Sequence, residues 1–182
     1  MILDEIAAAT RLRVEQLQRI KDLNKIRSDA ESLPKNNRGF RTSLSRDGMN
    51  FITEVKKASP SKGIISKEFD YLRLARDYEA AGAAAISCLT EPQFFLGKDE
   101  YLKAISTAVK LPVLRKDFII SEYQIYEAKT IGADAALLIC ALLETSMIRE
   151  FLDIAASVGL DVLVEAHDES EVESALNAGA EI

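Results

Sequence analysis

Residues 81–89 read Ala-Gly-Ala-Ala-Ala-Ile-Ser-Cys-Leu, a glycine followed at once by an apolar run. Glycine stands at the corresponding place in later parts of the chain, at Gly132, Gly159 and Gly179. Just past a helix end, glycine supplies the left-handed backbone conformation that other residues resist. We therefore expect helices that end at these glycines and lead directly into strands.

Short apolar runs alternate with longer segments of helical spacing from residue 51 onward. The runs are residues 51–55, 83–89, 111–114, 135–139 and 161–164. The helical segments are residues 71–81, 101–109, 122–131, 146–158 and 170–178. Strands that alternate with helices form βαβ units around a parallel sheet. The pattern therefore predicts an α/β fold.

The first fifty residues follow a different pattern. Apolar residues recur at helical spacing over residues 2–26, among Lys, Arg, Glu and Gln side chains. Pro34 and Gly39 then interrupt the helical pattern. We expect a helical N-terminal extension over residues 1–49 and a main domain of βα units over residues 50–182.

Composition excludes several classes of protein. The chain has 182 residues, of which 48% are hydrophobic and 29% charged, and a formal net charge of −6. Disorder needs a less apolar chain, and no apolar run approaches the roughly 18 residues of a membrane-spanning helix. The acidic balance argues against nucleic-acid binding. Cys88 and Cys140 lie in apolar runs, which favours buried, reduced thiols in a cytoplasmic protein without a signal peptide.

Ionisable residues stand at the carboxyl ends of three expected strands, where α/β proteins collect their reactive groups. Glu54 and Lys56 are two residues apart and so share one face of the first strand, while Lys116 and Glu165 end two others. Each has a structural alternative: an ion pair for Glu54 and Lys56, a solvated loop for Glu165. Lys116 taken alone favours a solvated strand end, because Arg115 and Asp117 flank it. The recurrence on three strands favours an active site.

The loop after the first strand and the phenylalanines after later strands are further candidates. Ser59 and Pro60 belong to Lys-Ala-Ser-Pro-Ser-Lys-Gly (57–63), which suits an anion contact or an ordinary turn and lacks Walker-loop spacing. Phe95 and Phe118 suit either a core or the wall of an aromatic substrate site.

Metal and redox chemistry find little support in the sequence. His167 is the only histidine and has no cysteine ligand nearby, so we expect no metal site and place it in a loop without catalytic duty. Neither cysteine belongs to a C-x-x-C pair, which argues against redox chemistry.

Several segments together closely resemble the indole-3-glycerol phosphate synthase family. They are Phe-Ile-Thr-Glu-Val-Lys-Lys-Ala-Ser-Pro-Ser-Lys-Gly (51–63), Ala-Ile-Ser-Cys-Leu-Thr-Glu (85–91), Phe-Phe-Leu-Gly (94–97), Pro-Val-Leu-Arg-Lys-Asp-Phe (112–118), Gln-Ile-Tyr-Glu-Ala (124–128), Gly-Ala-Asp-Ala-Ala-Leu-Leu-Ile (132–139) and Leu-Val-Glu-Ala-His (163–167). The resemblance covers essentially the whole chain. It implies a (β/α)8 barrel of the TIM type with a helical N-terminal extension.

The resemblance also implies an activity without metal or organic cofactor. The family closes the indole ring of 1-(2-carboxyphenylamino)-1-deoxyribulose 5-phosphate, a small anionic substrate, and releases carbon dioxide and water. By the resemblance Lys116 is the general acid, Lys56 binds the substrate carboxylate, Glu165 takes part in proton transfer and Glu54 orients the lysines. Ser59 and Pro60 shape the substrate loop, and the apolar lining residues are Phe95, Phe118 and Leu137.

The same resemblance implies that the sequence stops before a sixth strand, with about five of eight βα units. We expect such a polypeptide to be catalytically silent and to self-associate through unpaired strand edges. That inactive, self-associating fragment is the alternative reading of its function. A related barrel, phosphoribosylanthranilate isomerase, is disfavoured because it needs a cysteine and an aspartate as its acid–base pair, and the first strand has no cysteine.

Overall fold

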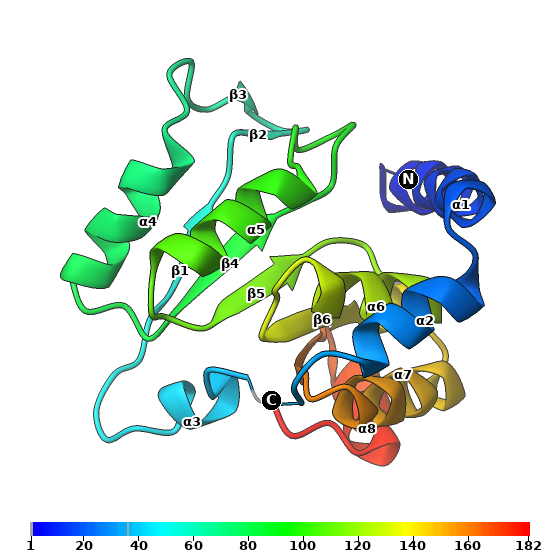
Figure 1. The fold of residues 1–182 in the computed structure, drawn as a ribbon. Helices are drawn as coiled ribbons and strands as arrows, with labels where there is room; N and C mark the ends of the chain where they lie inside the picture. Colours follow the sequence, from blue (N-terminus) through cyan, green and yellow to red (C-terminus); the bar gives the residue numbers. More distant parts are fainter. Residues whose placement is uncertain (1, 36) are drawn as a thin grey trace. The chain divides into compact units, whose positions relative to one another are not determined.

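The protein is an α/β structure, seen in a computed structural model that describes residues 2–35 and 37–182 (Figure 1). Helices α1 (Ile2–Ile20), α2 (Leu23–Glu31) and α3 (Phe40–Leu44) precede β1 (Ile52–Val55), β2 (Ala58–Ser59), β3 (Gly63–Ile64), α4 (Tyr71–Ala80), β4 (Ala85–Leu89), α5 (Asp99–Ala108) and β5 (Val113–Lys116). Then follow α6 (Glu122–Thr130), β6 (Ala135–Ile139), the short 3-10 helix η1 (Cys140–Leu142), α7 (Thr145–Ser157), β7 (Asp161–Glu165) and α8 (Glu169–Ala178). The strands of the main sheet run in the order β1-β4-β5-β6-β7, which confirms the predicted alternation of strands and helices.

The chain divides into two compact units. The first unit contains residues 1–36, 118–130 and 136–182, and the second contains residues 37–117 and 131–135. Both units therefore take residues from more than one part of the sequence. The expected boundary between residues 49 and 50 stays a prediction.

The second unit is built on three parallel strands. β1 pairs with β4 and β4 pairs with β5, both in parallel register. Helices α4 and α5 pack against each other and against these strands. All five residues of β4 are buried, as expected for a central strand covered on both faces.

The first unit is mainly helical. Helix α2 packs on α6, and α7 packs on both α6 and α8. Gly159 is required where the chain passes Lys35, because a Cβ on Gly159 would lie 1.8 Å from the Lys35 carbonyl oxygen. Gly159 also has a positive φ of 74°, as the helix-to-strand pattern predicts.

Three features of the structure differ from the sequence-based expectations. The helical pattern of residues 2–26 is split into α1 and α2, because Asp22 adopts an extended conformation and its carboxylate caps the N–H of Lys25 at 2.9 Å. The short helix α3 was not predicted as a separate element, because the helical spacing noted in the sequence ends at residue 26. The loop after β1 contains an antiparallel hairpin, β2–β3, that no alternating pattern announced.

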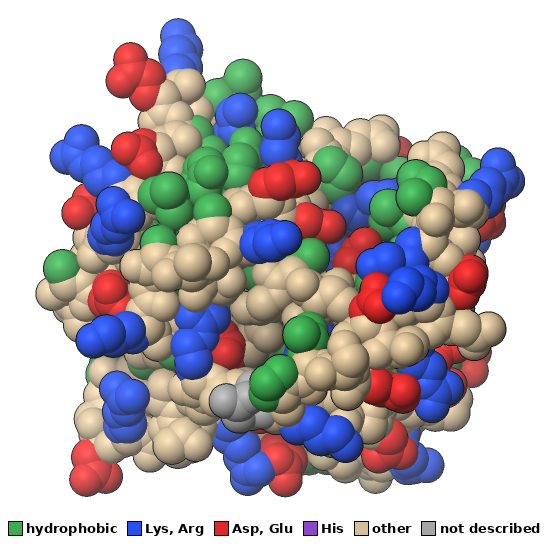
Figure 2. All heavy atoms as spheres, in the orientation of Figure 1, with side chains coloured by type: hydrophobic (Ala, Val, Ile, Leu, Met, Phe, Trp, Pro, Cys, Tyr) green, Lys and Arg blue, Asp and Glu red, His purple; other side chains and the backbone are tan. Residues whose placement is uncertain are grey.

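Charge and hydropathy give two further observations. Lys and Arg side chains are interspersed with Asp and Glu over the face seen in Figure 2. Over residues 2–35 and 37–182, no helix has both the length and the apolar character needed to cross a membrane.

Candidate active site

The carboxyl ends of β1, β4 and β5 lie at one level in the second unit. Val55 pairs with Cys88, and Cys88 pairs with Arg115, so the next residue of each strand reaches the same edge. Those next residues include Lys56 after β1 and Lys116 at the end of β5. The two predicted lysines therefore lie at the same edge of one parallel sheet, at the ends of β1 and β5, with β4 between them.

The register also places the predicted residues on the same face. Glu54 pairs with Ser87, and Ser87 pairs with Leu114. Side chains alternate along a strand, so Lys56 lies on the face of Glu54, and Lys116 lies on the face of Leu114. One face of β1, β4 and β5 thus carries a carboxylate and two ammonium groups at its carboxyl end.

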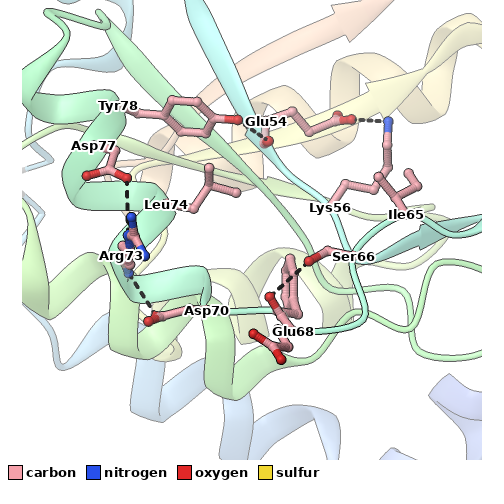
Figure 3. Close-up of a pocket in the computed structure, with 11 residues that line it drawn as sticks. Glu54, Lys56, Ile65, Ser66, Glu68, Asp70, Arg73, Leu74, Asp77 and Tyr78 are labelled. Atoms are coloured by element: carbon pink, nitrogen blue, oxygen red, sulfur yellow. Dashed lines mark hydrogen bonds and ion pairs between the residues drawn. The ribbon is translucent and has the colours of Figure 1, made fainter.

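Glu54 and Lys56 form an ion pair through Oε1 and Nζ (Figure 3). About a third of each side chain is exposed, 32% for Glu54 and 33% for Lys56, so both groups remain accessible to a ligand. The backbone is fixed at this point because the Tyr78 hydroxyl donates to the carbonyl oxygen of Glu54 at 3.2 Å. The ion-pair alternative considered for these residues is therefore present, and it is compatible with a role in a site.

A cavity of about 660 Å³ opens beside this ion pair, between β1, the segment after β3 and α4 (Figure 3). Its lining residues are Glu54, Lys56, Ile65, Ser66, Glu68, Phe69, Asp70, Arg73, Leu74, Asp77 and Tyr78. Four of these side chains are carboxylates and two are cationic, so the lining has a formal charge of 2 − 4 = −2. Such a lining disfavours a substrate that carries a carboxylate and a phosphate, so the cavity itself does not match the expected cationic pocket.

Lys116 is flanked by buried charges, and the interpretation that Arg115 and Asp117 mark a solvated strand end is wrong. The Arg115 side chain is 2% exposed and that of Asp117 is 0% exposed. Arg115 Nη2 lies 3.3 Å from Asp117 Oδ2 and 3.4 Å from Asp99 Oδ1, and Nε donates to Thr90 Oγ1 at 3.2 Å. The Thr90 hydroxyl in turn donates to Asp117 at 2.7 Å. A buried charge is tolerated only when it is paired and hydrogen-bonded, as it is here.

This buried network fixes the strand end that carries Lys116. The Thr90 N–H also donates to the Lys116 carbonyl oxygen, at 3.1 Å. Lys116 itself is half-buried, whereas its two neighbours are fully buried. Arg115 therefore lies on the packed face of β5, and Lys116 lies on the accessible face.

The loop after β1 is organised by the hairpin. Ser59 ends β2, and its hydroxyl lies 3.4 Å from the Ser61 hydroxyl and accepts the Lys62 N–H at 3.3 Å. Pro60 is exposed at the turn. The loop therefore presents hydroxyls and a lysine to solvent close to Lys56 in sequence.

Glu91 is a buried residue that the sequence analysis did not single out for a role. It is 2% exposed and follows β4, and its carboxylate accepts backbone N–H groups of Gln93, Phe94 and Phe95. Phe95, predicted to line the pocket, is half-buried in this loop. A glutamate between Thr90 and Pro92 carries no sequence signal for this use, because the three donors are backbone groups.

The remaining predicted residues belong to the first unit. Leu137 is 1% exposed in β6, and Phe118 is half-buried just after β5. Glu165 is the last residue of β7, and its Oε1 lies 3.3 Å from Nε2 of His167. His167, which was expected to have no catalytic duty, is exposed and also contacts Glu171 Oε2 at 3.3 Å through Nδ1.

The cysteines are buried, free thiols. Burial, with a smaller contribution from Asp99, raises the pKa of Cys88 to about 12, and burial also raises the pKa of Cys140. Within the described part of the chain, no three His, Cys, Asp or Glu side chains are grouped so as to hold a metal ion.

Comparison with known proteins gives consistent matches over the whole chain. Residues 3–182 match the family model described as indole-3-glycerol phosphate synthase. The chain is 55% identical over 183 residues to the indole-3-glycerol phosphate synthase of Ruminiclostridium cellulolyticum, with 100% of this chain and 70% of the relative covered. It is 56% identical to the enzyme of the same name from Endomicrobium trichonymphae, with 100% and 71% covered.

A solved structure with low sequence identity has a similar fold. It is that of a Schiff base-forming fructose-1,6-bisphosphate aldolase, with a TM-score of 0.52, 17% identity, and coverage of 84% of this chain and 65% of that chain. At this identity the similarity concerns the fold alone. It agrees with an arrangement of the (β/α) barrel type.

Proposed function

This chain belongs to the indole-3-glycerol phosphate synthase family, and from that premise we propose how its residues serve the reaction. The family comprises lyases of tryptophan biosynthesis that act on a small-molecule phosphate. The substrate, 1-(2-carboxyphenylamino)-1-deoxyribulose 5-phosphate, becomes indole-3-glycerol phosphate. A bond forms between the ketone carbon and the ring carbon that bears the carboxylate, carbon dioxide leaves, and the former ketone oxygen leaves as water with a proton from the adjacent methylene.

Lys116 is the general acid for ring closure in this proposal. The ketone oxygen gains negative charge as the new carbon–carbon bond forms, and an ammonium group beside it can donate a proton. The support is the position of Lys116 at the carboxyl end of β5, half-buried and on a strand end fixed by Arg115 and Asp117. A fixed strand end suits a group that must meet one atom of the substrate.

Lys56 binds the carboxylate of the substrate, and Glu54 orients the Lys56 ammonium. The support is their ion pair on the same face of the sheet as Lys116. A lysine that exchanges an internal carboxylate for a substrate carboxylate keeps a partner for its charge throughout.

The other roles are assigned by residue type and family resemblance. Glu165 takes part in proton transfer during dehydration, and Ser59 and Pro60 shape the substrate loop. The apolar part of the substrate contacts Phe95, Phe118 and Leu137.

Partners and location follow from the same proposal. The substrate is anionic, and the mixture of acidic and basic side chains in Figure 2 offers no continuous basic surface for nucleic acid on that face. Buried, free thiols favour a cytoplasmic location. The expectation that this 182-residue polypeptide is silent alone and self-associates through its outer strands, β1 and β7, stays a prediction that light scattering at micromolar concentration can test.

The observation that carries the proposal is the shared level and face of Lys56 and Lys116 at the carboxyl edge of the sheet. The test is turnover of the carboxyphenylamino substrate by the polypeptide expressed from the complete reading frame. Lys116→Ala should lower kcat by about 10²–10⁴-fold, the range expected for loss of a general acid. Lys110→Ala, a surface lysine after α5, is the matched control. A Lys116→Ala variant that retains more than half of the parent kcat contradicts the assigned role.

A further inference from the structure

We propose that Glu91 is a positioning residue that holds Phe95 in the substrate site. The inference rests on the proposed function, since it assumes that Phe95 lines the pocket. Glu91 is buried, and its hydrogen bonds to residues 93–97 lie within the second unit.

The Glu91 carboxylate accepts hydrogen bonds from three consecutive backbone N–H groups. Oε1 accepts the Gln93 N–H at 3.0 Å, and Oε2 accepts the N–H groups of Phe94 and Phe95 at 2.7 and 3.0 Å. The carbonyl oxygen of Glu91 accepts the Gly97 N–H at 2.7 Å. One residue therefore satisfies four backbone donors of the loop that carries Phe95.

The far end of the same loop is equally constrained. Leu96 has a φ of 52°, a conformation that is uncommon for a residue other than glycine and that persists where the surroundings impose it. A Cβ on Gly97 would lie 2.4 Å from the carbonyl oxygen of Leu89, so no side chain fits at this position. The loop is thus held by hydrogen bonds to Glu91 at its start and restricted by the lack of space at Gly97 at its end.

The near end of the loop is joined to the strand that carries Lys116. Thr90 precedes Glu91, donates its backbone N–H to the Lys116 carbonyl oxygen and shares its hydroxyl with Arg115 and Asp117. These hydrogen bonds connect the loop that carries Phe95 to the end of β5. A displaced loop would move the aromatic wall relative to the proposed general acid.

The expected kinetic effect follows from where Phe95 acts. An aromatic wall contacts the substrate ring in the ground state and in the transition state alike, so its displacement raises KM with little change in kcat. Loss of one aromatic contact corresponds to about a tenfold weaker binding. A substitution that lowers only the free energy of unfolding would leave KM and kcat of the folded enzyme unchanged.

The variant that tests the hydrogen bonds between the Glu91 carboxylate and the backbone of residues 93–95 is Glu91→Gln, which keeps the size of the side chain. Either orientation of the amide places an NH2 group against backbone donors, so at least one of the three N–H groups loses its acceptor. We expect faster hydrogen exchange at the amides of residues 93–95, an approximately tenfold higher KM and a kcat within about threefold of the parent. A substrate analogue whose ketone is reduced to an alcohol cannot cyclise, and its Kd should rise by the same factor as KM.

Two further variants keep the result interpretable if Glu91→Gln folds poorly. Gly97→Ala disturbs the loop from its other end and should raise the analogue Kd similarly. Glu79→Gln is the matched control, because Glu79 Oε1 also accepts a backbone N–H, from Lys110 at 2.6 Å, but in a different loop. It should leave KM, kcat and the analogue Kd unchanged.

A double-mutant cycle with Phe95→Ala decides whether Glu91 acts through Phe95. We expect Glu91→Gln to add almost nothing to the analogue Kd in the Phe95→Ala background. Equal effects in both backgrounds, or faster amide exchange with an unchanged Kd, would overturn the inference while leaving the proposed function intact. An unchanged Kd for Phe95→Ala alone would instead contradict the proposed place of Phe95, and the role of Glu91 would fall with it.

Discussion

Arg38 donates to both carboxylate oxygens of Asp134, a residue 96 positions later in the chain. Nε lies 3.1 Å from Oδ1 and 2.9 Å from Oδ2, and Nη2 lies 2.5 Å from Oδ2. The Arg38 Nη1 also donates to the carbonyl oxygens of Ser106 and Val109, at 2.8 and 3.1 Å. Asp134 accepts in addition the backbone N–H of Val113, at 2.8 Å, just where β5 begins. The pair therefore ties the segment before β1 to the amino end of β5.

Removal of this pair should destabilise the protein strongly. The Asp134 side chain is 7% exposed and that of Arg38 is 27% exposed, so loss of Arg38 leaves a buried carboxylate without its partner, at a cost of up to about 3–5 kcal/mol. We expect Arg38→Ala to lower the free energy of unfolding by roughly that amount in urea titrations. Arg73→Ala is the control, because Arg73 and Asp77 are exposed and 3.8 Å apart. Equal midpoints for the two variants would contradict the importance of the buried pair.

Glu54→Gln should reduce turnover without a large loss of stability. The substitution keeps the shape of the side chain but removes the charge that pairs with the Lys56 ammonium. We expect kcat to fall by at least about tenfold, at the low end of what acid–base residues contribute. Glu68→Gln, in the lining of the same cavity and exposed, should be neutral. Parent-like kcat in Glu54→Gln would leave only a structural ion pair.

Glu165→Gln should lower kcat by about 10²–10⁴-fold if its carboxylate moves a proton. The change keeps the size of the side chain and one acceptor oxygen at the end of β7. Glu171→Gln serves as the control, because Glu171 contacts the same His167 ring but is assigned no contact with substrate. If the pH–rate profile of Glu165→Gln coincides with that of the parent, Glu165 is structural.

Alkaline pH should reveal the burial of Cys88. Its pKa is raised by burial from 9.0 to about 12, so between these values the unfolded state loses a proton that the native state keeps. Stability conferred by the protonated thiol is full below about pH 9 and declines as pH rises towards 12, with a slope of up to about 1.4 kcal/mol per pH unit. Cys88→Ala should show a shallower decline in unfolding free energy over this range. Parallel curves for parent and variant would show that the thiol ionises equally in both states.

Much of the fold could be predicted from the sequence because strands and helices have different apolar periods. The apolar run at residues 135–139 became β6 without adjustment, and the glycines before β4 and β7 have positive φ as predicted. The break at Asp22 was missed because a side-chain cap leaves the apolar spacing of residues 2–26 intact. The hairpin β2–β3 was missed because two-residue strands are too short to show alternation.

Part of the candidate site could likewise be predicted from the sequence, and part of it could not. Glu54, Lys56 and Lys116 could be placed from the sequence, because parallel strands end at one edge and side chains alternate. The burial of Arg115 and Asp117 could not, since their partners Thr90 and Asp99 are distant in the chain. The role of Glu91 could not be predicted for a different reason. Its partners are backbone N–H groups, which every residue except proline possesses.

Arg115 and Lys116 are adjacent cations on opposite faces of β5, so the register of this strand decides which cation lies on which face. Strand side chains have a period of two, so a slip of β5 by one position would exchange Arg115 and Lys116 between the two faces. A guanidinium, which does not release its proton near neutral pH, would then stand in place of Lys116, the proposed general acid, and a lysine would enter the buried network. Such a slipped chain would retain its composition and nearly all its helices and yet lack the proposed proton donor at this position. Correct folding of this strand is therefore measured more sensitively by chemistry than by helix content.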